Sequence, residues 1–126
     1  RNVMRVLTPH TIAADVDQWE FKHTWKNGVL HCLEPVSFDL ASAESIRDKA
    51  RHWLGRLSAI ADSRERFRVH FLVGEPQDPE LHRAYETALT ILNKAEVQRE
   101  IVRERDAEAF AQRFAAEIEK HEADVN

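Results

Sequence analysis

A histidine and a glutamate on one predicted hairpin have the types and spacing best suited to chemistry. Asn27-Gly28 separates two runs of alternating large and polar residues, which predicts a β-hairpin closed by a two-residue type I′ turn. In that register His23 and Glu34 are diagonal neighbours on the more apolar face. A carboxylate beside a histidine on an apolar surface is an arrangement that shifts pKa values at functional sites. The alternatives are a structural pair at the rim of the core, or a bulge at Pro35 that turns Glu34 outward.

The same register assigns every hairpin residue to one of two faces. The more apolar face is predicted to carry Trp19, Phe21, His23, Trp25, Leu30, Cys32, Glu34 and Val36. The opposite face is predicted to carry Glu20, Lys22, Thr24, Lys26, Val29, His31 and Leu33. Trp25 and His31 are therefore expected on opposite faces.

Zinc binding by the hairpin has little support from the spacing. His23, Cys32 and Glu34 are three possible ligands on adjacent strands, but none of the seven histidines forms the paired spacings typical of zinc sites. Cys32 is the only cysteine, which excludes a disulfide within the chain and is typical of a reducing compartment. We interpret Cys32 as a small buried hydrophobe and predict no cofactor.

A magnesium-dependent nuclease is the main catalytic alternative. Strands followed by a helix and a further strand resemble the PD-(D/E)-x-K nuclease core, in which acidic side chains hold Mg²⁺ beside the scissile phosphate and a lysine stabilises the attacking water. Asp17, Glu34 and Asp39 are the candidate metal ligands of this alternative. Glu34-Pro35-Val36 places valine where the motif requires lysine, so the scaffold is predicted to be degenerate if it is nuclease-like.

The charge pattern is uneven, although the net charge is only −4. Seven basic and three acidic residues lie between Arg47 and Arg68, whereas five basic and nine acidic residues lie between Glu96 and Asn126. Nucleic-acid binding would depend on Arg47, Arg51 and Arg56, which share one predicted helix face, and it has little support because no aromatic residues are interleaved and the protein is acidic. Solvated helix faces with local salt bridges are the simpler interpretation.

The hydrophobic pattern predicts an α/β domain with a mixed sheet: an N-terminal antiparallel hairpin followed by α-β-α-β-α. Helices are predicted over 42–61 and 78–92 and from 106 onward, and strands over 67–73 and 97–102. The hairpin is expected at the sheet edge, with Pro35 at an edge or a bulge. Gly55 is expected to allow close packing of its helix on the sheet.

We predict three divisions of the chain: a lead-in segment (1–16), a single α/β domain (17–122) and a tail (123–126). No apolar run approaches the ~20 residues of a membrane helix. The chain begins at Arg1 rather than Met, so we expect it to be part of a longer protein.

Several short motifs resemble a bacterial family of domains of unknown function. The runs that carry the resemblance are Asn27-Gly28-Val29-Leu30-His31, Pro35-Val36-Ser37-Phe38-Asp39-Leu40, Ile46-Arg47-Asp48-Lys49-Ala50, Leu72-Val73-Gly74 and Asp78-Pro79-Glu80-Leu81. The chain resembles the C-terminal half of such proteins, which are often encoded beside HipA-like kinases. The resemblance implies a bacterial cytoplasmic interaction domain and transfers no catalytic residue.

These observations predict a protein-interaction or regulatory domain without its own catalytic site. The candidate binding residues are His23, His31 and Glu34 on the hairpin and Arg47 and Arg51 on the helix. The expected partner is a protein, either a kinase-like neighbour or another part of the same longer chain; a nucleic-acid partner has weaker support, and no membrane partner is expected.

Overall fold

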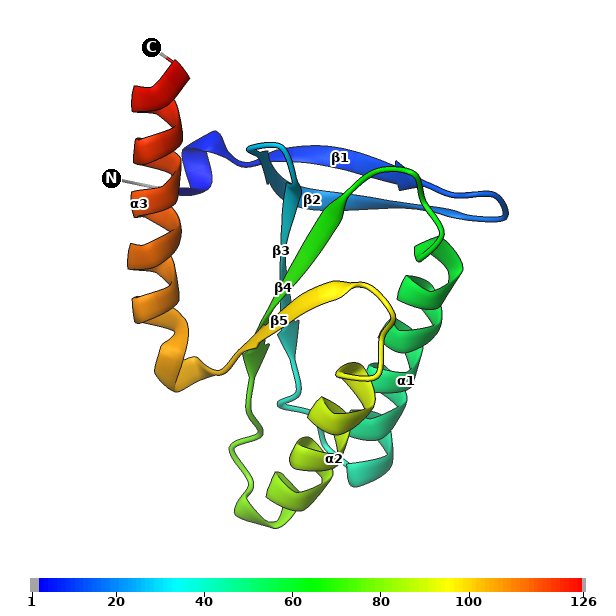
Figure 1. Cartoon of the computed structure of the whole chain (residues 1–126). Helices are drawn as coiled ribbons and strands as arrows, with labels where there is room; N and C mark the ends of the chain where they lie inside the picture. The colour runs from blue at the N-terminus through cyan, green and yellow to red at the C-terminus, as the bar shows by residue number, and fades with distance from the viewer. Residues whose placement is uncertain (1–2, 126) are drawn as a thin grey trace.

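The fold is a five-stranded mixed sheet with two helices on one face and one helix on the other (Figure 1). A computed structural model describes residues 3–125. The strands are β1 (Thr8–Ala13), β2 (Gln18–Lys26), β3 (Leu30–Ser37), β4 (Phe67–Gly74) and β5 (Gln98–Val102). The helices are α1 (Ala43–Ile60), α2 (His82–Leu92) and α3 (Ala107–Val125), with 3₁₀ turns η1 (Val3–Val6), η2 (Pro79–Leu81) and η3 (Glu104–Asp106).

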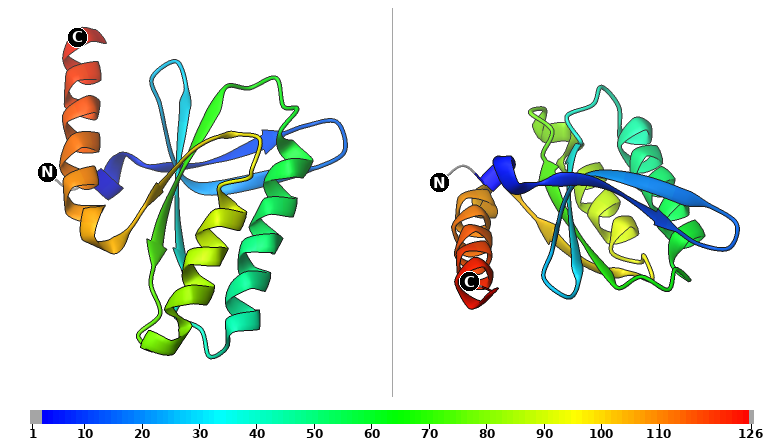
Figure 2. Two further views of the ribbon diagram at one scale, coloured as in Figure 1. Left: turned by 60° about the horizontal axis from the view of Figure 1, so that its bottom comes forward. Right: turned by 90° about the horizontal axis from the view of Figure 1, so that it is seen from above.

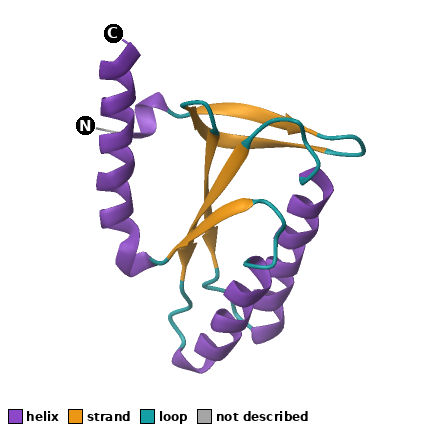
Figure 3. Ribbon diagram, in the orientation of Figure 1, coloured by secondary structure: helices purple, strands orange, loops and turns teal. Residues whose placement is uncertain are grey.

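The strands lie in the sheet in chain order, from β1 at one edge to β5 at the other (Figure 3). β1, β2 and β3 form an antiparallel meander, and β4 and β5 add to β3 in parallel. The predicted mixed α/β architecture is confirmed. Its connections follow the usual rule that parallel neighbours are joined through a helix, here α1 and α2.

Local signals placed most elements correctly. Ser42 caps α1, its side chain accepting a hydrogen bond from the backbone N–H of Ser45. Along β4, Phe67, Val69, Phe71 and Val73 are buried on one face, as their alternation predicts. The remaining helices begin with a tighter turn than expected, because η2 precedes α2 and η3 precedes α3.

The segment before Asp17 belongs to the fold, which corrects our expectation of a lead-in. β1 pairs with β2 from Thr8 to Ala13, and Ile12 is fully buried in the main core. Val6 and Leu7 pack against the core beneath α3. Pro9 excludes a helix but is tolerated in β1, because an edge strand need not donate every backbone N–H. The β2–β3 hairpin is consequently interior, not the edge of the sheet.

The register of the β2–β3 hairpin differs by one residue from the prediction. Lys26 pairs with Leu30 and Trp25 with His31, so the loop contains three residues, Asn27 to Val29. Within the described chain only Gly28 has a positive φ, of 103°, whereas a type I′ turn needs one at both central positions. The slip brings Trp25 and His31 to the same face, and the predicted face assignment is wrong there.

A bulge in β2 explains why Trp19 and Phe21 still lie on the same face of the sheet as Cys32 and Val36, as the sequence predicts. β1 partners Thr24 with Thr8 and Phe21 with His10, so β2 has one extra residue between these pairs, at Lys22 or His23. Phe21 and Thr24 are therefore both buried. The bulge lets the first half of β2 pack toward α1 while Trp25 packs toward α3.

The expectation for Pro35 agrees with the structure, whereas that for Gly55 does not. β3 pairs with β2 only up to Cys32, so Pro35 lies where β3 is locally open on that side, as its missing N–H requires. Gly55 is exposed on α1, and an added Cβ would meet no atom within 4 Å. It therefore does not mediate close packing on the sheet, contrary to our expectation.

Two cores of unequal size lie on the two faces of the sheet. The larger core lies between the sheet and α1 and α2, which pack side by side (Figure 2). The smaller core consists of five buried residues, Leu33, Val102, Phe110, Phe114 and Ile118. α3 contributes three of these, and its last turns extend past the sheet in Figure 1. Between residues 3 and 125 no helix is both long and apolar enough to cross a membrane.

Candidate functional site

A row of hydrogen-bonded polar side chains crosses the three parallel strands beneath α3. His31 lies on β3, His70 on β4 and Glu100 on β5. Nδ1 of His31 is 2.9 Å from Nε2 of His70, and Nδ1 of His70 is 2.9 Å from Oε1 of Glu100. The row continues at both ends, to the side-chain amide of Asn27 and to the guanidinium of Arg113. It is a continuous chain of five side chains.

The strand register explains why these side chains meet. His70 is the direct partner of Glu100 across β4 and β5 and of Leu33 across β3 and β4. His31 is two residues before Leu33 and therefore on the same face of the sheet. The parallel pairing thus brings His31 and His70 together although they are 39 positions apart in the sequence.

α3 covers the middle of the row. The ring centroids of Phe110 and Phe114 lie 5.3 Å and 5.9 Å from that of His70, which is only 5% exposed. His31 is half-buried and stacks on Trp25 at 5.8 Å. The row therefore passes from solvent at Asn27, through a buried histidine, to a partly exposed ion pair between Glu100 and Arg113.

The geometry fixes how protons are arranged in the row. A carboxylate only accepts, so Nδ1 of His70 donates to Glu100 and Nε2 of His70 is left facing His31. Two nitrogens 2.9 Å apart hold one proton between them, which in the neutral pair is carried by Nδ1 of His31. The first added proton binds Nε2 of His31, beside Asn27. A second added proton would break the bond between the rings.

The surroundings resist those added protons. Burial lowers the pKa of His31, and the charge of Arg68 acts in the same direction, against Glu117. Burial also lowers the pKa of His70, in spite of its hydrogen bond to Glu100. Burial alone would raise the pKa of Glu100, but the hydrogen bonds from His70 and Arg113 lower it. The favoured state is a neutral histidine pair beside a charged carboxylate.

A small cavity of about 170 Å³ opens beside the row. It is lined by His31, Arg68, His70, Glu100, Phe110, Arg113, Phe114 and Glu117. Arg68 and Glu117 are exposed, and Arg68 forms no ion pair with any residue that the structure describes. Its charge is therefore free to meet an incoming group.

Of the predicted hairpin residues, only His31 belongs to this row. His23 lies half-buried at the bulge in β2. Glu34 lies on the opposite face of the sheet, where burial raises its pKa and the charges of Arg56 and Lys22 partly offset the effect. No hydrogen bond or ion pair joins His23 to Glu34 in the described chain. The register slip and the bulge separate the predicted pair.

Arg47 and Arg51 are engaged within their own helix. Arg47 binds Glu44 at 2.7 Å, and Arg51 binds Asp48 at 2.8 Å and Glu44 at 3.3 Å. These two residues therefore form local salt bridges on a solvated helix face, which is the simpler of the two interpretations of the basic segment. Their charges are offset before any partner arrives.

The structure does not bring Asp17, Glu34 and Asp39 together as a metal site. Asp17 lines a surface hollow against the second half of α1, whereas Asp39 follows the end of β3, just before α1 begins. Asp17 accepts from the backbone of Gln18, and Asp39 from that of Gln77. Over residues 3–125, no three His, Cys, Asp or Glu side chains are clustered closely enough to hold a metal ion. Because β2 and β3 pair only near the hairpin loop, Asp17 at the start of β2 is not held beside Glu34 on β3.

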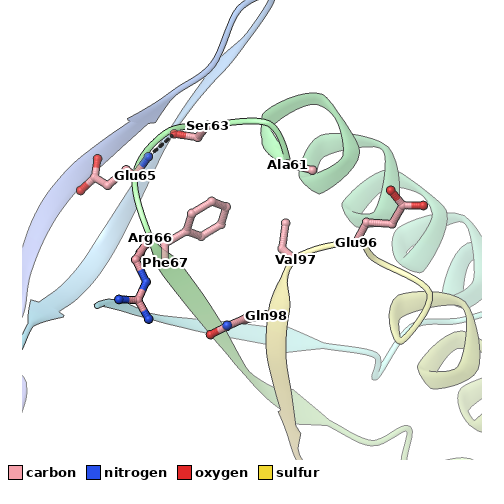
Figure 4. A pocket seen from close by; sticks show the side chains of 8 residues that line it. All are labelled: Ala61, Ser63, Glu65, Arg66, Phe67, Glu96, Val97 and Gln98. Atoms are coloured by element: carbon pink, nitrogen blue, oxygen red, sulfur yellow. Dashed lines mark hydrogen bonds between the residues drawn. The ribbon is translucent and has the colours of Figure 1, made fainter. Parts of the chain in front are cut away.

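Figure 4 shows another cavity, of about 190 Å³, between the loop after α1 and the start of β5. Phe67 and Val97 face each other across it. The carboxylate of Glu65 points away from it, toward β1, and lies 2.8 Å from Nε2 of His10. Its charged groups do not converge as those beneath α3 do, so we do not place the site there.

Sequence reasoning missed His70, Glu100, Arg113 and Arg68. The available signal was weak: His70 is a polar residue at a buried position of the largely apolar β4, and Glu100 is one of three polar residues in the short β5. Their partnership depends on the parallel register of β3, β4 and β5, which no local pattern specifies. His31 was found because it lies on a recognisable hairpin.

The fold and the row together define a mixed α/β domain with a partly buried histidine–histidine–glutamate chain under a single helix. No protein-family model matches this chain, and no curated protein or solved structure is significantly similar to it. The resemblance to a bacterial family of unknown function therefore remains a prediction.

Proposed function

We propose that this chain is a protein-interaction or regulatory domain of the bacterial cytoplasm, and that its partner binds beside His31, where β3, β4 and α3 meet. The observation that carries the proposal is the cavity of about 170 Å³ with the free charge of Arg68 in its lining. Ligand pockets for small molecules are typically about 300–1,000 Å³. A cavity of this smaller size suits one protruding side chain of a protein partner.

The group that we propose to enter is an acidic side chain placed against Arg68, on the side of the cavity away from the exposed carboxylate of Glu117. Arg113 is already bound to Glu100 at 2.7 Å, so Arg68 supplies the available positive charge. Nε2 of His31 adds a polar atom at half-buried depth. An aspartate or glutamate placed against Arg68 gains a charge-assisted hydrogen bond in partly desolvated surroundings.

The partner that we propose is a kinase-like neighbour or another part of a longer chain. A domain that adjusts such a partner needs a binding surface rather than a set of reacting groups. The Trp25, His31 and Phe114 rings pack against one another beside that surface, with centroids 5.6 to 5.8 Å apart, and aromatic side chains are enriched among residues that anchor a partner.

The test is calorimetric titration of the whole chain with the kinase-like neighbour and, separately, with the remainder of the longer protein. Arg68→Glu is expected to weaken binding about tenfold or more, because it replaces an attraction by a repulsion. Arg83→Glu is the matched control, since Arg83 is exposed on α2, on the other side of the sheet. Equal affinities of the Arg68 variant and wild type would contradict the proposed binding surface. If neither candidate binds, the proposed partner is wrong.

A further inference from the structure

A polar row, in addition to the smaller apolar core, joins α3 to the centre of the sheet. α3 has three buried residues over its 19-residue length, and Arg113 on the same helix ends the row at Glu100. Phe110 and Phe114 pack directly on the His70 ring. The packing of α3 is thus coupled physically to the protonation state of the histidine pair.

We propose that His31 and His70 form a pH-sensitive switch that keeps α3 packed on the sheet while the pair is neutral and loosens it as the pair takes up protons in mild acid. The inference goes beyond the proposed function and stands without it, because it needs no partner.

The first step of the argument is the proton count. The neutral pair carries one proton on each Nδ1, which makes the bonds from His31 to His70 and from His70 to Glu100 and leaves Nε2 of His31 without a proton to donate to Oδ1 of Asn27. One added proton fits at Nε2 of His31, where Asn27 presents an acceptor oxygen. The next has no site except Nε2 of His70, which already receives the His31 proton. Further acidification therefore separates the two rings.

The second step is the charge around the pair. The facing groups are Arg68 from β4, Glu100 from β5, and Arg113 and Glu117 from α3. Two arginines and two glutamates cancel, so each proton taken up adds an uncompensated positive charge. β2 contributes the uncharged Trp25 ring, and α3 also contributes His121, which contacts that ring rather than the pair.

The third step is the position of that charge. His70 is 5% exposed, and its cover on the helix side is two phenylalanine rings. Moving α3 away lets water reach a charged His70, whereas the neutral ring is accommodated where it is. Protons therefore bind more tightly to the loosened form, and by linkage they favour it.

Hydrogen exchange of the whole chain tests this switch. The measured quantity is the opening equilibrium of α3 amides, after correction for the intrinsic pH dependence of exchange, between about pH 8 and pH 5, with α1 amides as the measure of global unfolding. The opening constant of α3 is expected to rise about tenfold for each unit by which the pair's pKa values differ between the packed and loosened forms, and to exceed that of α1 at every pH. An α3 opening constant that does not change with pH, or that coincides with that of α1, would overturn the proposal.

Matched variants identify the responsible groups. His31→Gln/His70→Gln keeps polar side chains but cannot be protonated in this range, and it is expected to abolish the pH response of α3. His52→Gln/His82→Gln removes two exposed histidines of α1 and α2 and is expected to retain it. His121→Gln, on α3 itself, is also expected to retain it. A response that survives in the first double variant overturns the proposal.

Nitrogen-15 spectra of the histidine rings give a reading that does not depend on the variants. At neutral pH both His31 and His70 are expected to carry their proton on Nδ1, and their acid titrations are expected to be linked. Two rings that titrate independently, or a His70 protonated on Nε2 at neutral pH, would overturn the switch even if the double variant failed to fold. Because no partner is present in any of these measurements, their failure is distinct from a failure of the proposed function.

Discussion

The indole ring of Trp25 is stacked on the imidazole of His31, with 5.8 Å between the ring centroids and 29° between the planes. This contact exists because the hairpin loop has three residues, which brings both side chains to the α3 face. It also places a fluorescent group beside one end of the polar row. Because the ring of His121 also lies 5.4 Å from Trp25, Trp25 reports the charge on His31 in a His121→Gln variant.

The fluorescence of Trp25 is expected to fall as the solution is acidified, because a protonated imidazole in contact with an indole quenches it. Since burial lowers the pKa of His31 from 6.5, the midpoint is expected below pH 6.5. The measurement is steady-state fluorescence of the His121→Gln variant against pH at constant ionic strength. Trp25→Phe should remove the transition, whereas Trp53→Phe should leave it; a transition that persists without Trp25 would contradict the assignment.

The stability of the domain is expected to fall as the pH is lowered through 6.5. The pKa values of His31 and His70 are both lower in the folded chain, so below 6.5 the unfolded state binds more protons than the folded state. Their contribution is fully present above pH 6.5 and is lost toward the folded pKa values. The slope is at most about 1.4 kcal/mol per pH unit for each ring.

Urea unfolding at a series of pH values measures this slope. His31→Gln/His70→Gln should flatten it between about pH 7 and pH 5, and His82→Gln should not. His70→Ala should in addition cost about 1–3 kcal/mol at neutral pH, since it leaves a half-buried glutamate without one of its hydrogen bonds. A stability that rises on acidification in this range would contradict the lowered pKa values.

The elements that could be predicted from the sequence are those that a local signal fixes. Ser42 marks the start of α1, and alternation identifies β4, because each signal acts within a few residues. The predicted length of the hairpin loop was wrong by one residue, because Asn27-Gly28 suits more than one loop length. The longer loop is the one that lets Trp25 pack under α3. β1 was not predicted, because Pro9 is unusual within a strand and only the pairing with β2 accounts for it.

The candidate site depends on longer-range relationships. Glu100 reaches His70 only through the β4–β5 register, and Arg113 reaches Glu100 only once α3 has packed. Such contacts arise from the whole fold, so composition and spacing do not specify them.

Gly55→Ala is expected to stabilise the domain by about 0.5–1 kcal/mol, because glycine in a helix interior costs conformational entropy relative to alanine. The site is exposed and open, with no atom within 4 Å of an added Cβ. Chemical denaturation provides the measurement. Gly28→Ala is the matched control and should destabilise, since Gly28 has φ of 103°, which alanine rarely adopts. A destabilised Gly55 variant would show that α1 has a contact at this position.

Glu34→Gln is expected to stabilise the domain at neutral pH by less than about 1 kcal/mol. Burial raises the pKa of Glu34, so its ionised form is disfavoured in the folded chain. The folded state gains from protonation at low pH and loses that gain as the pH rises through the raised pKa. The advantage of glutamine should therefore vanish below about pH 4.5, the ordinary value for glutamate. Glu20→Gln, on the exposed surface of β2, should change little, and equal effects of the two variants would argue against burial as the cause.

The thiol of Cys32 is expected to be inert in the native domain and reactive once the domain unfolds. Cys32 is fully buried, and burial together with the charges of Glu65 and Glu34 raises its pKa to about 12. The nucleophilic thiolate is then scarce at about pH 8, and the reagent has no access to it. Labelling with a thiol reagent at that pH should follow the population of the open state, provided that reclosing is faster than the reaction. Gly55→Ala should accordingly slow labelling about 2- to 5-fold, as its expected gain in stability requires. Rapid labelling of the native wild type would contradict this prediction. It would show that the segment of β3 around Cys32 opens locally.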